Sequence, residues 1–166
     1  MSVNTISSPG PSASNLSQSR PPPRQRILVV EDDVDIRRLN TEILIRAGYL
    51  VNAAKDGKTA WEALHLDSYD LMITDNNMPE LTGVELLKML HVAGLAVPVI
   101  MATGTLPTWE LAIFPWLQPV AVLLKPYTGA ELLGSVNAIL QKTNYYREAK
   151  AHPNSQNRPP ADGLQP

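Results

Sequence analysis

The chain has 166 residues, 44% of them hydrophobic, and a formal net charge of −2 from 14 basic and 16 acidic side chains. This length suits one ordinary domain with tails, and the lack of a basic surplus argues against nucleic acid or a membrane surface as a direct partner. Cysteine is absent, which excludes disulfides and thiolate metal sites. Without a signal-peptide pattern or a run of about 20 apolar residues, a soluble, cytoplasmic protein is expected.

Both ends of the chain differ in composition from its middle. Residues 1–25 are rich in Ser, Pro, Asn and Gln, and residues 144–166 contain four of the 15 prolines and few large apolar side chains. Segments of this kind cannot bury enough apolar surface to offset the entropy of ordering. We therefore predict two disordered tails around one domain at residues 26–143.

Strands and helices are predicted to alternate through this domain. Apolar runs predict strands at 26–30, 49–54, 71 to Asp75, 99–102 and 120–124. Apolar residues at helical spacing predict helices after the first strand up to Gly48, then at 59–66, 81–91, a short one from Pro107 that Pro115 ends or kinks, and 128–143. The stripe expected to face the core is Ile36, Leu39, Ile43 and Ala47 in the first helix, and Leu132, Val136, Ile139 and Leu140 in the last.

Strict alternation of strands and helices with short connections predicts a parallel sheet with helices on both faces. The expected fold class is α/β, a flavodoxin-like, doubly wound (βα)5 three-layer sandwich with strand order 2-1-3-4-5. In this order a crevice opens at the carboxyl ends of the first and third strands, where open α/β sheets bind ligands.

Polar side chains follow the predicted strands at this edge of the sheet. They are Glu31, Asp32 and Asp33 after the first strand, Asp75 and then Asn77 after the third, Thr103 after the fourth and Lys125 after the fifth. Any one of them alone is compatible with a helix cap or a solvated charge. Their arrival at one edge indicates a site.

The residue types at this edge suggest phosphoryl chemistry. Clustered carboxylates repel one another unless a cation lies between them, and all-oxygen ligands suit Mg²⁺. A carboxylate such as Asp75 can then attack phosphorus and form an acyl phosphate. Lys125 and the hydroxyl of Thr103 would supply positive charge and a donor to the transferring group.

Four stretches resemble the receiver domain of two-component response regulators. They are Ile27-Leu-Val-Val-Glu-Asp-Asp33, Ile73-Thr-Asp75-Asn-Asn-Met-Pro79 with Gly83, Met101-Ala-Thr-Gly104, and Leu124-Lys125-Pro126. Both their identity and their spacing match, over about 120 residues.

The resemblance implies roles for the residues at the sheet edge. Asp75 would be the phosphoacceptor and, with Asp32, would bind Mg²⁺. Glu31 would assist the metal through water, and Asn77 through its backbone carbonyl. Thr103 and Lys125 would bind the phosphoryl group, Lys125 pairing with Asp75 in its absence. The remaining assignments are Asn77 and Thr105 as tuners of phosphoryl lifetime, a cis peptide before Pro126, and Asp33 as a cap or outer acid.

The same resemblance implies a protein that signals through protein partners and is not an enzyme. A histidine kinase or phosphotransfer protein would donate the phosphoryl group. A downstream effector protein would read the result on the face formed by the fourth helix, the fifth strand and the fifth helix. Because no helical output module follows residue 143, a stand-alone receiver is expected. It would be a signalling protein with only self-phosphorylation and slow self-dephosphorylation.

Two features depart from the family pattern. Val122 occupies a switch position where the family usually has Tyr or Phe. Residues 109–119, which contain Trp109, Phe114 and Trp116, replace a usually Ala-rich helix. These aromatic side chains could belong to the core or form a partner or dimer surface. Tyr127 is close to the usual Phe and is expected to pack.

Two other functions remain open. The altered Val122 and 109–119 segment are compatible with an interaction module that needs no phosphorylation. A phosphohydrolase of the haloacid-dehalogenase type shares an Asp nucleophile, a Thr or Ser, a Lys and Mg²⁺. It is disfavoured because Asn77 stands where that family has a second Asp.

Overall fold

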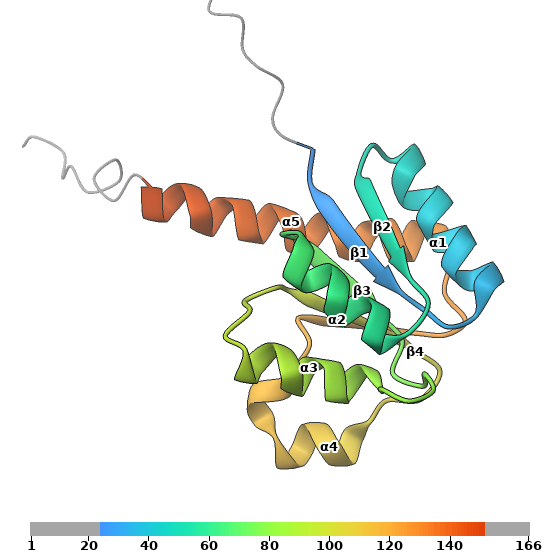
Figure 1. Cartoon of the computed structure of the whole chain (residues 1–166). Coiled ribbons are helices and arrows are strands. Elements are labelled where there is room, and N and C mark those ends of the chain that lie inside the picture. Colours follow the sequence, from blue (N-terminus) through green and yellow to red (C-terminus); the bar gives the residue numbers. More distant parts are fainter. Residues whose placement is uncertain (1–23, 152–166) are drawn as a thin grey trace, which may run out of the picture.

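A computed structural model describes residues 24–151, which form one five-stranded parallel sheet with helices on both faces (Figure 1). The strands are β1 (Arg26–Val30), β2 (Leu50–Ala54), β3 (Leu71–Thr74), β4 (Val99–Thr103) and β5 (Ala121–Leu124). The helices are α1 (Val34–Arg46), α2 (Gly57–Leu66), α3 (Gly83–Val92), α4 (Thr108–Ile113), a 3₁₀ turn η1 (Pro115–Leu117) and α5 (Gly129–Ala151). The strand order β2-β1-β3-β4-β5 confirms the predicted fold class.

Strand register explains why the polar residues meet. Val30 pairs with Thr74, so Glu31 and Asp75 leave neighbouring strands at the same level. Thr103 pairs with Leu124 in the same way, and the amide of Lys125 donates to the carbonyl of Thr103 over 3.0 Å. The carboxyl ends of β1, β3, β4 and β5 therefore form one edge, as the topology requires.

Two apolar cores cover the two faces of the sheet. One lies beneath α2, α3 and α4, and the other beneath α1 and α5. All four stripe residues predicted for the last helix are buried. This agrees with amphipathic helices packing on a sheet that is apolar on both sides.

The stripe predicted for the first helix is partly wrong. Leu39 is 58% exposed and Ala47 is also exposed, whereas Asn40 and Leu44 are buried. Asn40 can take an inward position because its amide donates to the hydroxyl of Tyr127 over 2.8 Å. Spacing of apolar residues alone does not reveal such a polar partner.

The last helix is longer than predicted. It continues to Ala151, so residues 144–151 are helical where the sequence predicted a disordered tail. Arg147 from this extension pairs with Asp70 at the start of β3, with 2.7 Å between Nη1 and Oδ1. The rest of the predicted tails, residues 1–23 and 152–166, lies outside the described residues.

The segment after β4 is irregular, as its prolines predict. Helix α4 has only six residues and no side-chain cap at its start. Pro115 begins the turn η1 directly after it, and the side chain of Gln118 donates to the carbonyl of Leu111 over 3.0 Å. A short helix and a 3₁₀ turn, anchored in the core by Leu111 and Leu117, thus connect β4 to β5.

Candidate functional site

Three carboxylates gather at the ends of β1 and β3. One oxygen from each of Glu31, Asp32 and Asp75 lies within 4.8 Å of the others. Glu31 and Asp75 are buried, with 2% and 6% of their surface exposed, and Asp32 is exposed. Charged groups are seldom buried without a partner, so this arrangement requires a counter-charge.

Lys125 supplies that counter-charge. Its ammonium donates to Oε2 of Glu31 and to Oδ2 of Asp75, each over 2.7 Å. The pairing with Asp75 was predicted, and the pairing with Glu31 was not. Because β5 delivers Lys125 from the far side of β4, only the folded sheet brings its ammonium to both acids.

The loop after β3 holds the Asp75 carboxylate by its other oxygen. The amides of Asn76 and Asn77 both donate to Oδ1, the second over 3.1 Å. The start of α3 packs closely on this loop at Gly83, where an added Cβ would lie 2.4 Å from the carbonyl oxygen of Asp75. Glycine is therefore required here for the loop to close around the carboxylate.

The pKa values of Asp75, Glu31 and Lys125 depend on burial and on the hydrogen bonds among these side chains. Burial favours the neutral form of Asp75, but hydrogen bonds from Lys125 and the Asn77 amide outweigh burial and lower its pKa. Burial of Glu31 outweighs the same lysine, so the pKa of Glu31 is raised. Burial opposes the charge on Lys125, but the two carboxylates dominate and raise its pKa. Asp75 is thus ionised at neutral pH, as a nucleophile requires.

Hydrogen bonds to backbone atoms hold the acidic loop after β1 in place. Asp33 caps α1 by accepting from the amides of Asp35 and Ile36, which confirms its predicted role as a cap. Arg37 donates to the carbonyl oxygens of Glu31 and Asp32, over 2.7 and 3.0 Å. Arg37 was not predicted as a site residue, and its only signal in the sequence is its position one turn into α1.

Thr103 and its neighbours form the third side of the site. Thr103 is fully buried, and its hydroxyl donates to the carbonyl of Thr105 over 3.1 Å. Thr105 and Asn77 are exposed. The peptide bond between Lys125 and Pro126 is cis. Of the predicted site residues, Lys125 is hydrogen-bonded to Glu31 and Asp75, and Asp32 places a carboxylate oxygen within 4.8 Å of both acids.

The donor set of the crevice suits a hard divalent cation. The formal charges of three carboxylates and one ammonium sum to −2, which a divalent ion would balance. The oxygens come from Glu31, Asp32 and Asp75, and oxygen is the ligand type that Mg²⁺ prefers. Exposed Asp32 leaves room for the waters that Mg²⁺ keeps.

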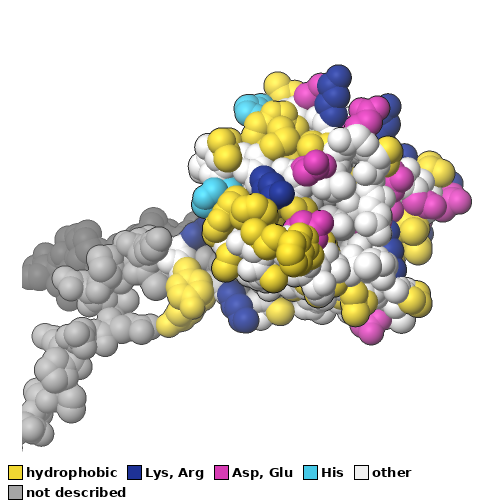
Figure 2. Space-filling model, turned by 90° about the horizontal axis from the view of Figure 1, so that it is seen from below, with side chains coloured by type: hydrophobic (Ala, Val, Ile, Leu, Met, Phe, Trp, Pro, Cys, Tyr) yellow, Lys and Arg dark blue, Asp and Glu magenta, His cyan; other side chains and the backbone are white. Residues whose placement is uncertain are grey.

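A second surface carries apolar side chains between α4 and β5. Trp109 is 74% exposed, so the core interpretation is wrong for it, whereas Phe114 packs against the core. Along the same stretch of chain Ile113, Trp116, Val120, Val122 and Leu124 are also exposed, and Trp116 stacks on His91 of α3 with 4.2 Å between the ring centroids. Figure 2 shows hydrophobic side chains gathered on the side of the molecule where Figure 1 places α4.

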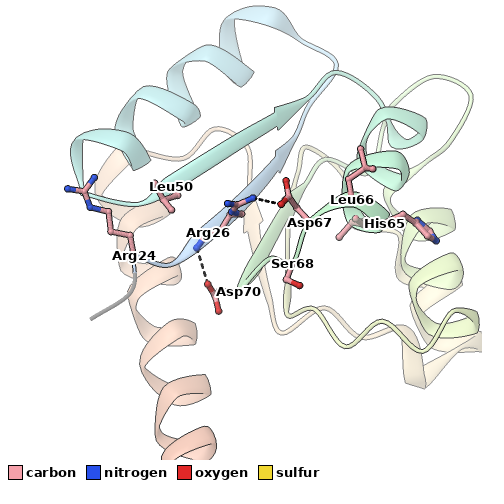
Figure 3. A pocket seen from close by; sticks show the side chains of 9 residues that line it. Arg24, Arg26, Leu50, His65, Leu66, Asp67, Ser68 and Asp70 are labelled. Carbon is pink, nitrogen blue, oxygen red and sulfur yellow. Dashed lines mark hydrogen bonds and ion pairs between the residues drawn. The ribbon is translucent and has the colours of Figure 1, made fainter. Parts of the chain in front are cut away.

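A hollow of about 590 Å³ lies at the opposite end of the sheet (Figure 3). Its wall contains an ion pair between Arg26 and Asp67, 2.7 Å long, and a bond from the Arg26 amide to Asp70. Asp70 also pairs with Arg147 of α5, which lies outside this wall. None of the residues that line the hollow belongs to the charged group around Asp75.

Comparison with known proteins gives a consistent result. Residues 27–137 match the family described as the response regulator receiver domain. The chain is 38% identical over 125 residues to the uncharacterized transcriptional regulatory protein YrkP of Bacillus subtilis, covering 75% of this chain and 53% of YrkP. It is 30% identical to the response regulator receiver protein CpdR of Brucella abortus, covering 70% of this chain and 97% of CpdR.

Solved structures agree with the sequence relatives. The response regulator protein TrrA of Thermotoga maritima, in complex with Mg²⁺-BeF, superposes with a TM-score of 0.62 at 28% identity, covering 69% of this chain and 98% of TrrA. The chain spans about half the length of the first curated relatives it matches. Within residues 24–151, no helix is both long and apolar enough to cross a membrane.

Proposed function

The chain belongs to the response regulator receiver domain family, and we propose that it accepts a phosphoryl group on Asp75 and passes this signal to a protein partner. The donor is the phosphohistidine of a histidine kinase or phosphotransfer protein. A carboxylate oxygen of Asp75 bonds to phosphorus, and the bond from phosphorus to the histidine nitrogen breaks. The imidazole keeps the electron pair and takes up a proton. The observation that carries this proposal is Lys125 held between two buried acids, one of them Asp75.

The residues around Asp75 have separate tasks in this transfer. Lys125 lies where negative charge accumulates on the phosphoryl oxygens, and its ammonium would turn from Oδ2 of Asp75 to the incoming group. The amides of Asn76 and Asn77 orient the carboxylate by its other oxygen. Thr103 gives up its bond to Thr105 and donates its hydroxyl to the phosphoryl group. Asn77 and Thr105 tune how readily water reaches the acyl phosphate.

Mg²⁺ is the cofactor that we propose for this site. Asp32, Asp75 and the backbone carbonyl of Asn77 would hold it, with Glu31 assisting through water. When bound, it would neutralise the carboxylates and the phosphoryl oxygens. Support comes from the carboxylate cluster and from TrrA, whose structure holds Mg²⁺-BeF.

The output is proposed to leave through the apolar surface between α4 and β5. Its exposed Trp109, Trp116 and Leu124 are typical of a surface that a protein partner covers. A change at Thr103 reaches this surface through the short connection to α4. We expect an effector protein as the reader, with no direct contact to nucleic acid or membrane.

Beryllofluoride with Mg²⁺ tests the proposal without a kinase. Amide resonances of Asp75, Thr103 and Lys125 should shift in the wild-type protein and stay in place in Asp75→Asn. Asp67→Asn is the matched control, because it removes a carboxylate at the opposite end of the sheet. Unchanged wild-type spectra at saturating Mg²⁺ and beryllofluoride would reject phosphoryl acceptance.

A second function is favoured by one observation. Val122 is 38% exposed on β5 where the family usually has an aromatic switch residue. Without that residue, the surface between α4 and β5 could bind its partner regardless of phosphorylation. A partner that binds Asp75→Ala and wild type with equal affinity, with and without phosphodonor, would support this function.

A further inference from the structure

The loop that carries Lys125 is attached to α1 by a buried polar pair. Asn40 on α1 is only 3% exposed, and its Nδ2 donates to the hydroxyl of Tyr127 over 2.8 Å. Tyr127 follows Lys125 by two residues and is half-buried. An inward-facing amide in the middle of a helix is costly unless it is paired, so this bond holds both side chains in place.

The loop between β5 and α5 makes a second close contact with α1. An added Cβ on Gly129, the first residue of α5, would lie 3.0 Å from Cδ1 of Ile43 on α1. The loop between β5 and α5 therefore approaches α1 at two points, Tyr127 and Gly129. Only the contact through Tyr127 is directional, because it is a hydrogen bond.

The opposite end of this loop is anchored to β4. The amide of Lys125 donates to the carbonyl of Thr103 over 3.0 Å. Between this anchor and Tyr127 lies Pro126, whose ring restricts the backbone. The loop is thus held at both ends, by Thr103 and by Tyr127, and this fixes the position of the Lys125 ammonium relative to Asp75.

From these contacts we infer that Asn40 and Tyr127 are positioning residues for Lys125. They touch neither Asp75 nor an incoming group, and they act by fixing the loop that aims the ammonium between Glu31 and Asp75. This inference rests on the proposed function in so far as Lys125 serves phosphoryl transfer. The Tyr127 hydroxyl is a feature of this chain, since the usual Phe at this position offers Asn40 no acceptor.

The test compares Tyr127→Phe and Asn40→Ala with Tyr49→Phe. Tyr49 also donates its hydroxyl to an asparagine, Asn137 on α5, but at a distance in sequence and space from the loop of Lys125. Both loop variants should lower the rate of phosphorylation by a small phosphodonor about tenfold, a typical effect of removing a group that orients a site residue. Tyr49→Phe should lower only the thermal midpoint.

The double variant should be no slower than Tyr127→Phe, because both changes remove the same bond. The side-chain NMR signal of Lys125 gives a readout that does not depend on phosphorylation. It should move in Tyr127→Phe and stay in place in Tyr49→Phe. If Tyr127→Phe loses stability while the Lys125 signal and the rate stay at wild-type values, the pair is merely structural and the inference is overturned.

Failure of the proposed function would look different. In that case the wild-type protein takes up neither a phosphoryl group nor beryllofluoride. The Lys125 signal in Tyr127→Phe then decides the positioning role by itself: a shift supports it and an unchanged signal overturns it.

Discussion

Lys125 Nζ lies 2.7 Å from Oδ2 of Asp75, although 50 residues separate them in the sequence. The same ammonium lies 2.7 Å from Oε2 of Glu31. One cation therefore compensates two buried acids, and the site keeps an excess of negative charge when both are ionised.

Replacing Lys125 with Met should destabilise the fold. Two buried carboxylates would lose their only close cation among the described residues, which should lower the unfolding free energy by about 3 kcal/mol at neutral pH. Urea denaturation measures this loss. Lys142→Met, on the exposed side of α5, is the control and should change little. A wild-type unfolding curve for Lys125→Met would contradict the charge balance described here.

The raised pKa of Glu31 predicts an unusual pH dependence of the unfolding free energy. Its folded pKa is raised, chiefly by burial. Between the unfolded pKa of Glu, about 4.3, and the higher folded value, the native state binds more protons, so Glu31 makes the fold more stable as the pH falls. Asp75 acts in the opposite sense, because its folded pKa is lowered and its contribution is lost as the pH falls through that value.

Glu31→Gln isolates the first of these effects. Without added metal, this variant should be more stable than wild type at pH 7. The difference should shrink as the pH falls through the folded pKa of Glu31, since the protonated acid is then neutral like Gln. Urea titrations at several pH values measure it. A difference that grows toward acid pH would have the wrong sign.

Magnesium should stabilise the protein through Asp32. At a free Mg²⁺ concentration about ten times the dissociation constant, the gain is about 1.4 kcal/mol. Asp32→Asn should abolish this gain and leave the metal-free stability nearly unchanged, because Asp32 is exposed. Asp33→Asn is the matched control, since Asn preserves the α1 cap. Equal Mg²⁺ responses in Asp32→Asn and wild type would exclude Asp32 as a ligand.

Trp109 should report whether the signal reaches α4. Beryllofluoride with Mg²⁺ should change the tryptophan fluorescence of wild type, and Trp109→Phe should remove most of that change. Trp61→Phe on α2 is the control and should retain it. The stability of Trp109→Phe should stay within about 0.5 kcal/mol of wild type, because the ring is exposed. If the change persists in Trp109→Phe, the path through α4 is wrong.

Most of the fold could be predicted because it rests on local patterns. Apolar runs that end in a polar residue marked the strands, and Pro115 marked the end of α4. The two main errors involve contacts between distant segments. Asn40 is buried because Tyr127 accepts its hydrogen bond. Helix α5 extends beyond residue 143, and Arg147 in this extension pairs with Asp70. Neither partner is visible in the local sequence.

The site could be predicted as a set of residues but not as a charge arrangement. Strand ends indicated Glu31, Asp75 and Lys125, since parallel strands deliver their carboxyl ends to one edge. Lys125 bonds to both acids because of the position of its loop relative to them. The spacing of residues along the sequence does not determine this position. Arg37 was missed for a similar reason, because it contacts backbone carbonyls and not side chains.

The central claim is that Asp75 carries the phosphoryl group. It is tested most directly by incubating the protein with a small acyl phosphate and Mg²⁺, then mapping the modified residue by borohydride reduction and peptide mass spectrometry. The modification should fall on Asp75 alone, require Mg²⁺, and be absent from Asp75→Asn. Modification at another carboxylate, or none on the wild-type protein, would contradict the proposal.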